Sequence, residues 1–349
     1  MTPTNGVLDV LARARRATSQ AMTAAVERLT PDIRRVASYH FGWTDRDGQP
    51  GGAPGGKGLR PALALLSAEA AWADADVGIP GAVAVELVHN FSLIHDDIID
   101  GDTERHHRPT VWSLYGVGPA IITGDALETL AHQVLLEACP TAGAAASVAL
   151  AEATAAMISG QADDIAFEAR PGVSVEECMA MSAAKTGALL GCASSVGAIL
   201  AGAPPATVGA LRDFGRHLGL AFQAVDDLLG IWGDPARTGK PAGNDLRQRK
   251  KSMPVVSALA AGGEEAEELR ALMLVAPGEE ASAVRQPLGH GEVERAAYLI
   301  EACGGREWTA IRAKSHLDAA LGALERVRLS PVPHRELADI AVFVVERDS

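Results

Sequence analysis

Three aspartates stand close together in the segment FSLIHDDIIDGD at residues 91–102. Asp96, Asp97 and Asp100 form a D-D-x-x-D pattern inside an apolar run with helical spacing. Positions four residues apart share one face of a helix, so Asp96 and Asp100 would point the same way, about one turn apart. Carboxylates this close repel one another unless a hard cation neutralises them, and Mg²⁺ is the oxygen-ligated choice. The pattern indicates either a magnesium site or a solvated acidic helix end.

A second acidic pair, Asp226 and Asp227, lies in LGLAFQAVDDLLGIWGD, where the other residues of the helical run are mostly apolar. Two such pairs on separate apolar helices would let two walls of a cavity face each other across a metal cluster. The second pair therefore favours metal binding as the interpretation of both acidic segments.

Cationic residues accompany both acidic segments. Lys240 and Lys250 follow the second pair in TGKPAGNDLRQRKK. Upstream of the first motif, GGKGLRP places Lys57 and Arg60 where a helix begins. Mg²⁺ can bridge a carboxylate to a phosphate, lysines neutralise the remaining charge, and helix N-termini also favour anions. The combination indicates a polyanionic, phosphate-bearing ligand.

Helices must position these residues, because the sequence favours helices over strands. Alanine is abundant and aromatic residues make up 4% of the chain, whereas strands draw on aromatic and β-branched residues. Apolar residues recur at helical spacing in most long segments. We expect helices within 7–40, 61–75, 82–100, 119–138, 143–168, 174–201, 206–232, 253–275, 307–327 and 334–346. These belong to one all-α domain covering residues 1–349, with surface loops at 43–58 and 276–289.

The composition excludes several classes of protein. The chain has 31 basic and 44 acidic residues, a net charge of −13, which argues against nucleic-acid binding. We find no uninterrupted apolar run of the ~18–20 residues that a membrane span needs, and no signal-peptide pattern at the N-terminus. The four cysteines are far apart, so neither a zinc site nor a disulfide framework is indicated. We expect a cytoplasmic protein without a membrane span.

Together, the motifs resemble those of the trans-isoprenyl diphosphate synthases, or polyprenyl synthetases, over about residues 55–255. The matching residues, in the family's order, are Lys57 and Arg60 of the GGK-x-x-R loop, His89, Asp96–Asp100, Arg105, Gln161 and Asp164 of GQ-x-x-D, the pair Lys185 and Thr186, Phe222, Gln223, Asp226 and Asp227 of F-Q-x-x-D-D, and Lys240 of T-G-K. The resemblance implies one large helical bundle of the isoprenoid synthase type with a central active-site cavity.

The implied reaction is head-to-tail transfer of a prenyl group from an allylic diphosphate to isopentenyl diphosphate. The resemblance assigns Asp96, Asp100 and Asp226 to about three Mg²⁺ ions that hold the allylic diphosphate. It assigns Arg105, Lys185 and Lys240 to the same diphosphate, and Lys57, Arg60 and His89 to the diphosphate of the acceptor. The other expected site residues are the catalytic carboxylates Asp97 and Asp227 and the substrate-binding residues His106, Thr186, Phe222, Gln223 and Lys250.

Three positions depart from the family pattern. Gly58 stands where an arginine is common. His106 replaces the second of two paired arginines, so one acceptor-side cation becomes a group whose ordinary pKa is about 6.5. Gly230 stands where a third aspartate of the second acid motif is usual, and Asp234 would compensate in part.

Product length in this family depends on side chains about one turn before the first acid motif. Phe91 and Ser92 occupy these positions, five and four residues before Asp96. A bulky ring beside a small residue, with no two-residue insertion between the aspartates, resembles members that make C20 products. We expect geranylgeranyl diphosphate, with farnesyl diphosphate as the next candidate. Phe91 would otherwise be an ordinary core residue.

Two other functions stay open. A class I terpene cyclase would also ionise a prenyl diphosphate with metal, but NDLRQRKKS has Gln248 where its second metal motif needs a serine. A non-catalytic partner subunit of a synthase would explain Gly58, His106 and Gly230 as eroded positions. Family members are usually homodimers, so we also expect a homodimer.

Overall fold

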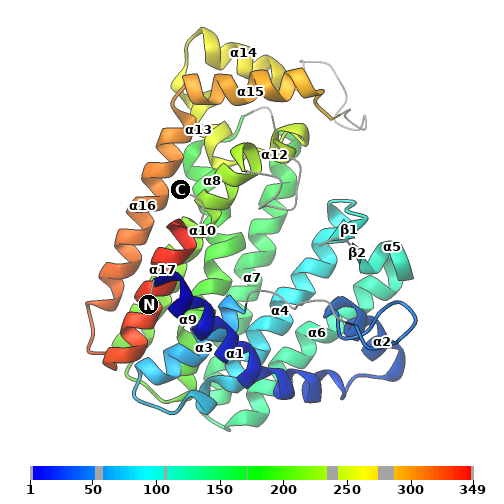
Figure 1. The fold of residues 1–349 in the computed structure, drawn as a ribbon, viewed down its shortest axis with the longest axis vertical. Helices are drawn as coiled ribbons and strands as arrows, with labels where there is room; N and C mark the ends of the chain where they lie inside the picture. Colours follow the sequence, from blue (N-terminus) through cyan, green and yellow to red (C-terminus); the bar gives the residue numbers. More distant parts are fainter. Residues whose placement is uncertain are drawn as a thin grey trace. The chain divides into compact units, whose positions relative to one another are not determined.

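The computed structural model describes residues 3–51, 58–105, 108–170, 172–233, 243–273 and 287–346. Most of these residues are helical, which confirms the expected all-α class (Figure 1). In chain order the elements are α1 (Pro3–Val26), α2 (Pro31–His40), α3 (Leu59–Ala70), the 3₁₀ turn η1 (Ala75–Gly78), α4 (Ile79–Ile99), β1 (Glu104–Arg105), β2 (Arg108–Pro109), α5 (Val111–Tyr115), α6 (Val117–Ala138), α7 (Ala142–Ala169), α8 (Val175–Ser182), the π-helical segment η2 (Ala183–Gly187), α9 (Ala188–Leu200), α10 (Pro205–Trp232), α12 (Asn244–Arg247), α13 (Met253–Ala261), α14 (Glu264–Met273), α15 (His290–Ala302), α16 (Gly305–Leu324) and α17 (Pro331–Glu346).

The chain divides into two compact units. Unit 1 comprises Met1–Thr154, Leu189–Gly215 and Ala323–Ile340, and unit 2 comprises Ala155–Ala188, Arg216–Gly322 and Ala341–Ser349. The units interleave in sequence, and a chain divided in this way can still fold as one domain. The single domain expected over 1–349 therefore stays a prediction.

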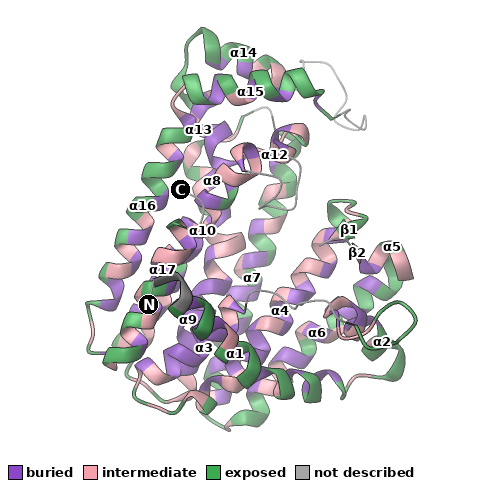
Figure 2. Ribbon diagram, viewed as in Figure 1, coloured by how far each residue is buried: buried purple, intermediate pink, exposed green. Residues whose placement is uncertain are grey.

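The core of unit 1 is built on α3 and α4. Helix α4 packs against both α3 and α6, and buried residues line most of α3 (Figure 2). Leu63, Leu66, Leu87 and Ile94 are among its fully buried side chains. Burying a side chain of this size stabilises the fold by about 1.5–3 kcal/mol. This packing fixes α4, which carries the first acid motif.

The core of unit 2 joins α12, α13, α14 and α15. Leu246, Val255, Leu269 and Leu299 are completely buried in one cluster. A second cluster holds Met253 against Ala224, Val225 and Val256. This packing fixes the part of α10 that carries the second acid motif.

The helix boundaries differ from the sequence-based expectation in several places. The segment 7–40 contains two helices, because Pro31 begins α2. The helix expected over 253–275 is also two, since Gly262 and Gly263 have φ of +73° and +93° and end the first helix at Ala261. The sequence did not predict α5, α12, α15 or the hairpin of β1 and β2. Short polar-rich elements such as α12 carry little periodicity to detect.

Three stretches are long and apolar enough to cross a membrane, judged by length and composition alone. They are Ala75–Ile99, Ala142–Ala169 and Val175–Leu200. In the first and third, 61% of the apolar window is buried inside the protein, against 33% in the second. Such windows tolerate interrupting polar residues, unlike the uninterrupted runs sought in the sequence. The expected absence of a membrane span therefore stays a prediction.

Candidate active site

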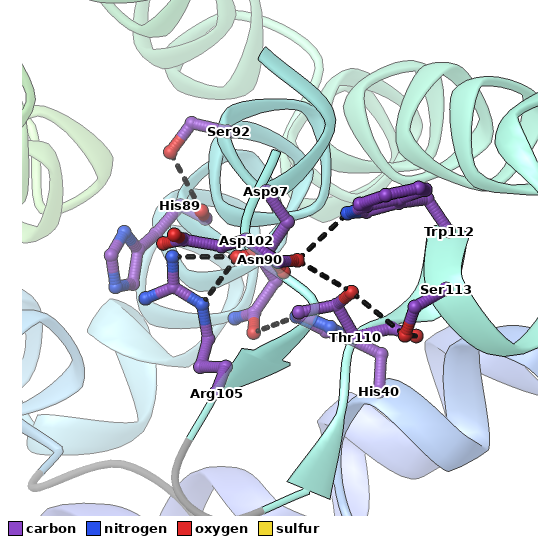
Figure 3. A network of polar contacts seen from close by, with 10 residues as sticks. All are labelled: His40, His89, Asn90, Ser92, Asp97, Asp102, Arg105, Thr110, Trp112 and Ser113. Carbon is purple, nitrogen blue, oxygen red and sulfur yellow. Dashed lines mark hydrogen bonds and ion pairs between the residues drawn. The ribbon is translucent and has the colours of Figure 1, made fainter. Parts of the chain in front are cut away.

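The first acid motif lies at the C-terminal end of α4, in unit 1. Asp97 is buried. Arg105 Nε donates a hydrogen bond to Asp97 Oδ1 at 2.8 Å, and Arg105 Nη2 lies 2.8 Å from the same oxygen in an ion pair (Figure 3). Successive positions on a helix turn by about 100°, so Asp96 and Asp100 lie on a different face from Asp97. Asp96 is half-buried and Asp100 is exposed. Asp97 thus holds an arginine from a buried position, whereas the side chains of Asp96 and Asp100 keep part of their surface exposed to solvent.

This position is electrostatically unfavourable for three carboxylates. Helix α4 ends at Ile99, and Asp100 is its C-cap. The negative end of the helix dipole costs an anionic side chain there about 0.3–1 kcal/mol. Burial raises the pKa of Asp97, its bond to Arg105 opposes that rise, and Asp102 and Asp100 add to it. A bound cation would relieve this repulsion, which is the physical reason to place one beside Asp96 and Asp100.

A short hairpin holds Arg105 over Asp97. Strands β1 and β2 pair antiparallel. The main-chain carbonyl of Asp102 accepts hydrogen bonds from Thr110 Oγ1 and Trp112 Nε1, each at 2.8 Å (Figure 3). These bonds tie the turn after α4 to the residues that follow the hairpin. The arginine is therefore positioned by local structure directly after the acid motif.

A group of cationic and imidazole side chains lies in the same unit. Burial lowers the pKa of His89 well below its ordinary value, and the nearby Arg60, His40 and Arg105 lower it further. Burial also lowers the pKa of the Arg60 guanidinium, which the Glu86 carboxylate opposes. Nε of Arg60 is buried and has no hydrogen-bond partner within the described ranges. A buried unsatisfied donor beside positive charge suits a phosphate oxygen.

His40 belongs to this group, although no sequence motif pointed to it. Its Nε2 lies 2.9 Å from Asn90 Oδ1. Because Asn90 Nδ2 donates to the Glu86 carbonyl at 2.7 Å, Oδ1 is the acceptor and His40 Nε2 carries the proton. Burial lowers the pKa of His40 to about 4, against the Asn90 hydrogen bond and together with the Arg105 and Arg108 charges. The imidazole is therefore neutral at pH 7.

In unit 2, the buried carboxylate of the second acid motif ends a chain of hydrogen bonds. Thr186 Oγ1 donates to Gln223 Oε1 at 2.7 Å, and Gln223 Nε2 donates to Asp227 Oδ1 at 2.7 Å. The Met253 N–H donates to the other oxygen, Oδ2, at 2.9 Å. Burial raises the pKa of Asp227 to about 7, although these hydrogen bonds oppose the rise. The neighbouring Asp226 is exposed, so the second motif repeats the division of the first into a buried and an accessible aspartate.

Lys185 and Thr186 lie in the π-helical segment η2. Single π-turns inserted in helices occur frequently at functional sites. Lys185 Nζ lies 2.5 Å from Asp164 Oδ2 on α7. A Cβ at Gly160 would lie 2.4 Å from the Lys185 nitrogen, so only glycine allows α7 to come this close. The G-Q-x-x-D and K-T motifs are thus one packed unit, which their separation in sequence did not reveal.

For the other described residues of the predicted site, the structure gives burial but few contacts that bear on a role. Gln161 Oε1 is buried and has no hydrogen-bond partner in the part of the chain that the structure describes. Phe222 and Lys250 are half-buried. Their expected contacts with substrate stay predictions. Lys57, His106 and Lys240, together with Asp234, lie outside the described residues.

The accessible aspartates fit magnesium by the chemistry of their oxygens. Among the described ranges, no group of three or more His, Cys, Asp or Glu side chains is arranged to hold a metal alone. Mg²⁺ usually binds through one or two carboxylates and takes its other ligands from water and substrate phosphates. Asp96 and Asp100 in unit 1, and Asp226 in unit 2, each carry oxygen ligands of this kind.

The two residues predicted to limit product length lie one turn before the first motif. Phe91 is 9% exposed, and its ring packs in a T-shaped arrangement with the His95 ring, with centroids 4.8 Å apart. Ser92 Oγ donates to the His89 carbonyl at 2.8 Å, which turns it back onto its own helix. His95 Nε2 lies 3.1 Å from the Ile121 carbonyl of α6. His95 thus packs between helices beside Phe91.

Gly58 has a structural reason to be glycine. It precedes α3 with φ +76°, a left-handed conformation that side chains rarely adopt. A Cβ there would also lie 2.5 Å from Cγ of Arg15. An arginine at position 58 would meet both obstacles, so the departure does not by itself indicate a lost activity.

Comparison with known proteins identifies the family of the chain. The sequence profile of the family described as polyprenyl synthetase matches residues 51–288. The chain therefore belongs to the polyprenyl synthetase family, which confirms the resemblance seen in its motifs.

Relatives cover nearly the whole chain. A (2E,6E)-farnesyl diphosphate synthase of Mycobacterium tuberculosis is 45% identical over 346 residues, which is 99% of this chain and 95% of that protein. A geranylgeranyl diphosphate synthase of the same organism is 41% identical over 323 residues, 92% and 90% of the two chains. The crystal structure of a polyprenyl synthetase from Streptomyces coelicolor A3(2) superposes with a TM-score of 0.91 at 51% identity, covering 97% of this chain and 99% of that one.

Proposed function

We propose that the protein is a Mg²⁺-dependent prenyltransferase that condenses an allylic diphosphate with isopentenyl diphosphate, head to tail. The product is an all-trans prenyl diphosphate of C15 or C20. The names of the relatives support this chemistry. The observation that carries the proposal is the grouping of Arg60, His89 and Arg105 directly beside the first acid motif.

Departure of the allylic diphosphate would be assisted by accessible carboxylates and by cations. Asp96, Asp100 and Asp226 would hold Mg²⁺, which neutralises charge on the leaving pyrophosphate when it is bound. Lys185 would donate hydrogen bonds to the same diphosphate, and Asp164 orients its ammonium group. Asp97 would orient Arg105 in the same way, because its carboxylate fixes the plane of the guanidinium.

The acceptor's diphosphate would bind at the cationic group of unit 1. Arg60 offers a buried Nε that has no hydrogen-bond partner among the described residues, and His89 lies close to the Arg60 charge. His40 would contribute to this binding site indirectly, by holding the Asn90 side chain with a hydrogen bond. Binding of an anion here would raise the pKa values of both imidazoles, because it reverses the local charge. Lys57 and His106 are expected to complete this set.

The series of buried hydrogen bonds in unit 2 would orient neighbouring side chains and would take no direct part in breaking bonds. Asp227 has both oxygens engaged, by Gln223 and by the Met253 N–H. Gln223 in turn holds Thr186, the neighbour of Lys185. This arrangement supports the proposal that Asp227 and Gln223, through Thr186, position the π-helical segment η2 that carries Lys185.

Several finer expectations belong to the same proposal. A homodimer is supported by apolar side chains that stand exposed along α6, namely Val117, Ile121, Ile122 and Leu136, since exposed apolar patches often mark interfaces. A cytoplasmic location agrees with the acidic net charge of −13. A C20 product, or a C15 product as the alternative, is supported by the buried ring of Phe91 next to the first motif.

The test is incubation of the purified full chain with Mg²⁺, isopentenyl diphosphate and an allylic diphosphate of C5, C10 or C15. An elongated prenyl diphosphate, identified by mass spectrometry, is the expected product. A hydrocarbon product would indicate a terpene cyclase instead. Absence of any product with all three starters, in protein shown to be folded, would favour a non-catalytic subunit. Asp226→Asn is the matched inactive control.

A further inference from the structure

Arg108 begins β2 and lies directly opposite Arg105 of β1, because the two residues are partners in the antiparallel register of the hairpin. Side chains directly opposite each other in such a pair project from the same face of the strands, and like charges there repel each other. Each arginine is therefore stable in the hairpin only with a partner of its own. Asp97 of α4 holds Arg105, and the end of α2 holds Arg108.

The end of α2 binds Arg108 through main-chain oxygens and an aromatic ring. Arg108 Nη2 donates to the Tyr39 carbonyl at 3.1 Å and to the Thr44 carbonyl at 3.3 Å. The guanidinium carbon lies 4.5 Å from the centre of the Tyr39 ring, which is a cation–π distance. The Tyr39 carbonyl belongs to the last turn of α2, the negative end of the helix dipole, where a cation is favoured. Charge, hydrogen bonds and ring contact thus hold Arg108 in the same position.

Tyr39 is itself fixed, both in the core of unit 1 and to the same strand. It is 5% exposed, and its Oη donates to the Pro109 carbonyl at 2.8 Å. Its ring packs in a T-shaped arrangement with Tyr115 of α5, with centroids 5.5 Å apart. Helix α2 packs against both α5 and α6. Both residues of β2 are therefore tied to a helix that is anchored in its turn.

We propose that Arg108 is a positioning residue for the reaction and acts through Arg105. By fixing β2 to the end of α2, it determines where the paired strand β1 presents Arg105 to the diphosphate. This inference rests on the proposed function and deepens it, because Arg108 lies outside the motifs that indicated the site. Arg108 would not bind substrate through Nη2, since two carbonyls already accept from that nitrogen.

The first experiment measures kcat/KM for an allylic diphosphate that the wild type elongates, in Arg108→Leu, Arg105→Gln and the double variant. Arg108→Leu should lower kcat/KM about 10- to 100-fold, because a small displacement of a group that orients substrate can cost about that much. In the Arg105→Gln background the same change should have little effect, since it leaves no arginine at position 105 to position. Equal losses in both backgrounds would overturn the proposal, because an independent substrate ligand or a purely structural residue acts whether or not Arg105 is present.

A second experiment changes the anchor and leaves both arginines in place. Tyr39→Phe keeps the ring beside the guanidinium and loses only the hydrogen bond to Pro109, whereas Tyr39→Leu loses both. Tyr39→Leu should therefore lower kcat/KM more than Tyr39→Phe, and its effect should also disappear in the Arg105→Gln background. Equal kcat/KM for Tyr39→Leu and the wild type would contradict the anchoring role.

Two further variants at arginine positions make the comparison specific. Arg108→Lys keeps a charge and a donor, so it should recover part of the activity that Arg108→Leu loses. Arg295→Leu is the matched control, because the Arg295 guanidinium lies 5.2 Å from the Tyr298 ring on α15, in unit 2. This control should leave kcat/KM unchanged. An equal loss in Arg295→Leu would mean that any arginine removed from a tyrosine ring has the same general effect.

The failure of this inference and the failure of the proposed function are distinguishable. Melting temperatures of the same preparations show which variants are folded, and if Arg108→Leu is not, Arg108→Lys with and without Arg105→Gln decides in its place. A wild type that elongates prenyl chains, with equal losses in both backgrounds, means that only the role of Arg108 is wrong. A wild type that forms no product with any starter means that the proposed function is wrong, and the role of Arg108 in that reaction with it.

Discussion

Arg105 binds one oxygen of Asp97 with two of its nitrogens, and it does so from a hairpin that begins just after the acid motif. The Asp97 side chain is 2% exposed and that of Arg105 is 30% exposed. An ion pair with one fully buried partner is costly to break, because the remaining charge is left without compensation. The pair therefore links the stability of the α4 end to the orientation of a predicted substrate-binding arginine.

Substitutions of Asp97 and Arg105 should have strongly coupled effects on the free energy of unfolding. In a double-mutant cycle of Asp97→Asn and Arg105→Gln, we expect a coupling free energy of about 1–3 kcal/mol in urea unfolding. The exposed pair of Arg28 and Glu137 is the matched control, and it should give about 0–1 kcal/mol. Additive effects of the two changes at Asp97 and Arg105 would contradict the buried pair.

The accessible aspartates should matter for turnover and little for stability. Asp96→Asn and Asp226→Asn should each lower kcat by about 100-fold or more, since each would remove charge stabilisation that acts in the transition state. Asp163→Asn, an exposed change on α7, should leave kcat unchanged. Steady-state kinetics at saturating Mg²⁺ and thermal unfolding of the same preparations separate the two effects. Lower melting temperatures with unchanged kcat would count against metal binding by these residues.

The sequence was a good predictor of the helices that position the site. It was a poor predictor of the side-chain contacts within the site. The apolar periodicity of α4 and α10 reveals both helices, and the acid motifs indicate which ends matter. The contact of Gly230 with Asp245 was invisible, because it depends on how α12 returns to α10 in space. His40 was missed for the same reason, since its partner Asn90 is distant in sequence.

Stability should depend on pH through His40. Its pKa in the folded protein is about 4, below the ordinary value of 6.5. Between these values the unfolded chain binds a proton that the folded protein does not, so the free energy of unfolding falls as pH drops from about 6.5 to 4. In His40→Gln, which keeps a donor for Asn90, the loss between pH 7.5 and pH 5 should shrink by about 1–2 kcal/mol.

Urea unfolding of both proteins at the two pH values measures this difference. His89 also has a lowered pKa and is present in both proteins. The His40 charge contributes to that lowering after burial and the Arg60 charge, so the measured difference includes the part of the His89 shift that depends on His40. Identical pH profiles for the wild type and His40→Gln would show that His40 titrates normally.

Restoring a side chain at position 58 should be harmful. Gly58→Ala should lower the free energy of unfolding by about 1–3 kcal/mol, because of its left-handed φ and the collision with Arg15. Gly6→Ala is the matched control, since a Cβ there meets nothing within 4 Å. Thermal or urea unfolding provides the comparison. A stabilised Gly58→Ala would mean that the glycine reflects an eroded motif after all.

Removing the ring of Phe91 should lengthen the product. The ring is buried one turn before Asp96, where a growing chain passing below the diphosphate would meet it. Phe91→Ala should shift the main product up by at least one C5 unit, and Phe91→Leu, which loses less core volume, should shift it less. Chromatography of the dephosphorylated products gives the chain length. Phe214→Leu, a change at a fully buried ring elsewhere in unit 1, should lower stability and leave product length unchanged. If Phe91→Ala is folded and active but makes the wild-type product, the ring is an ordinary part of the core.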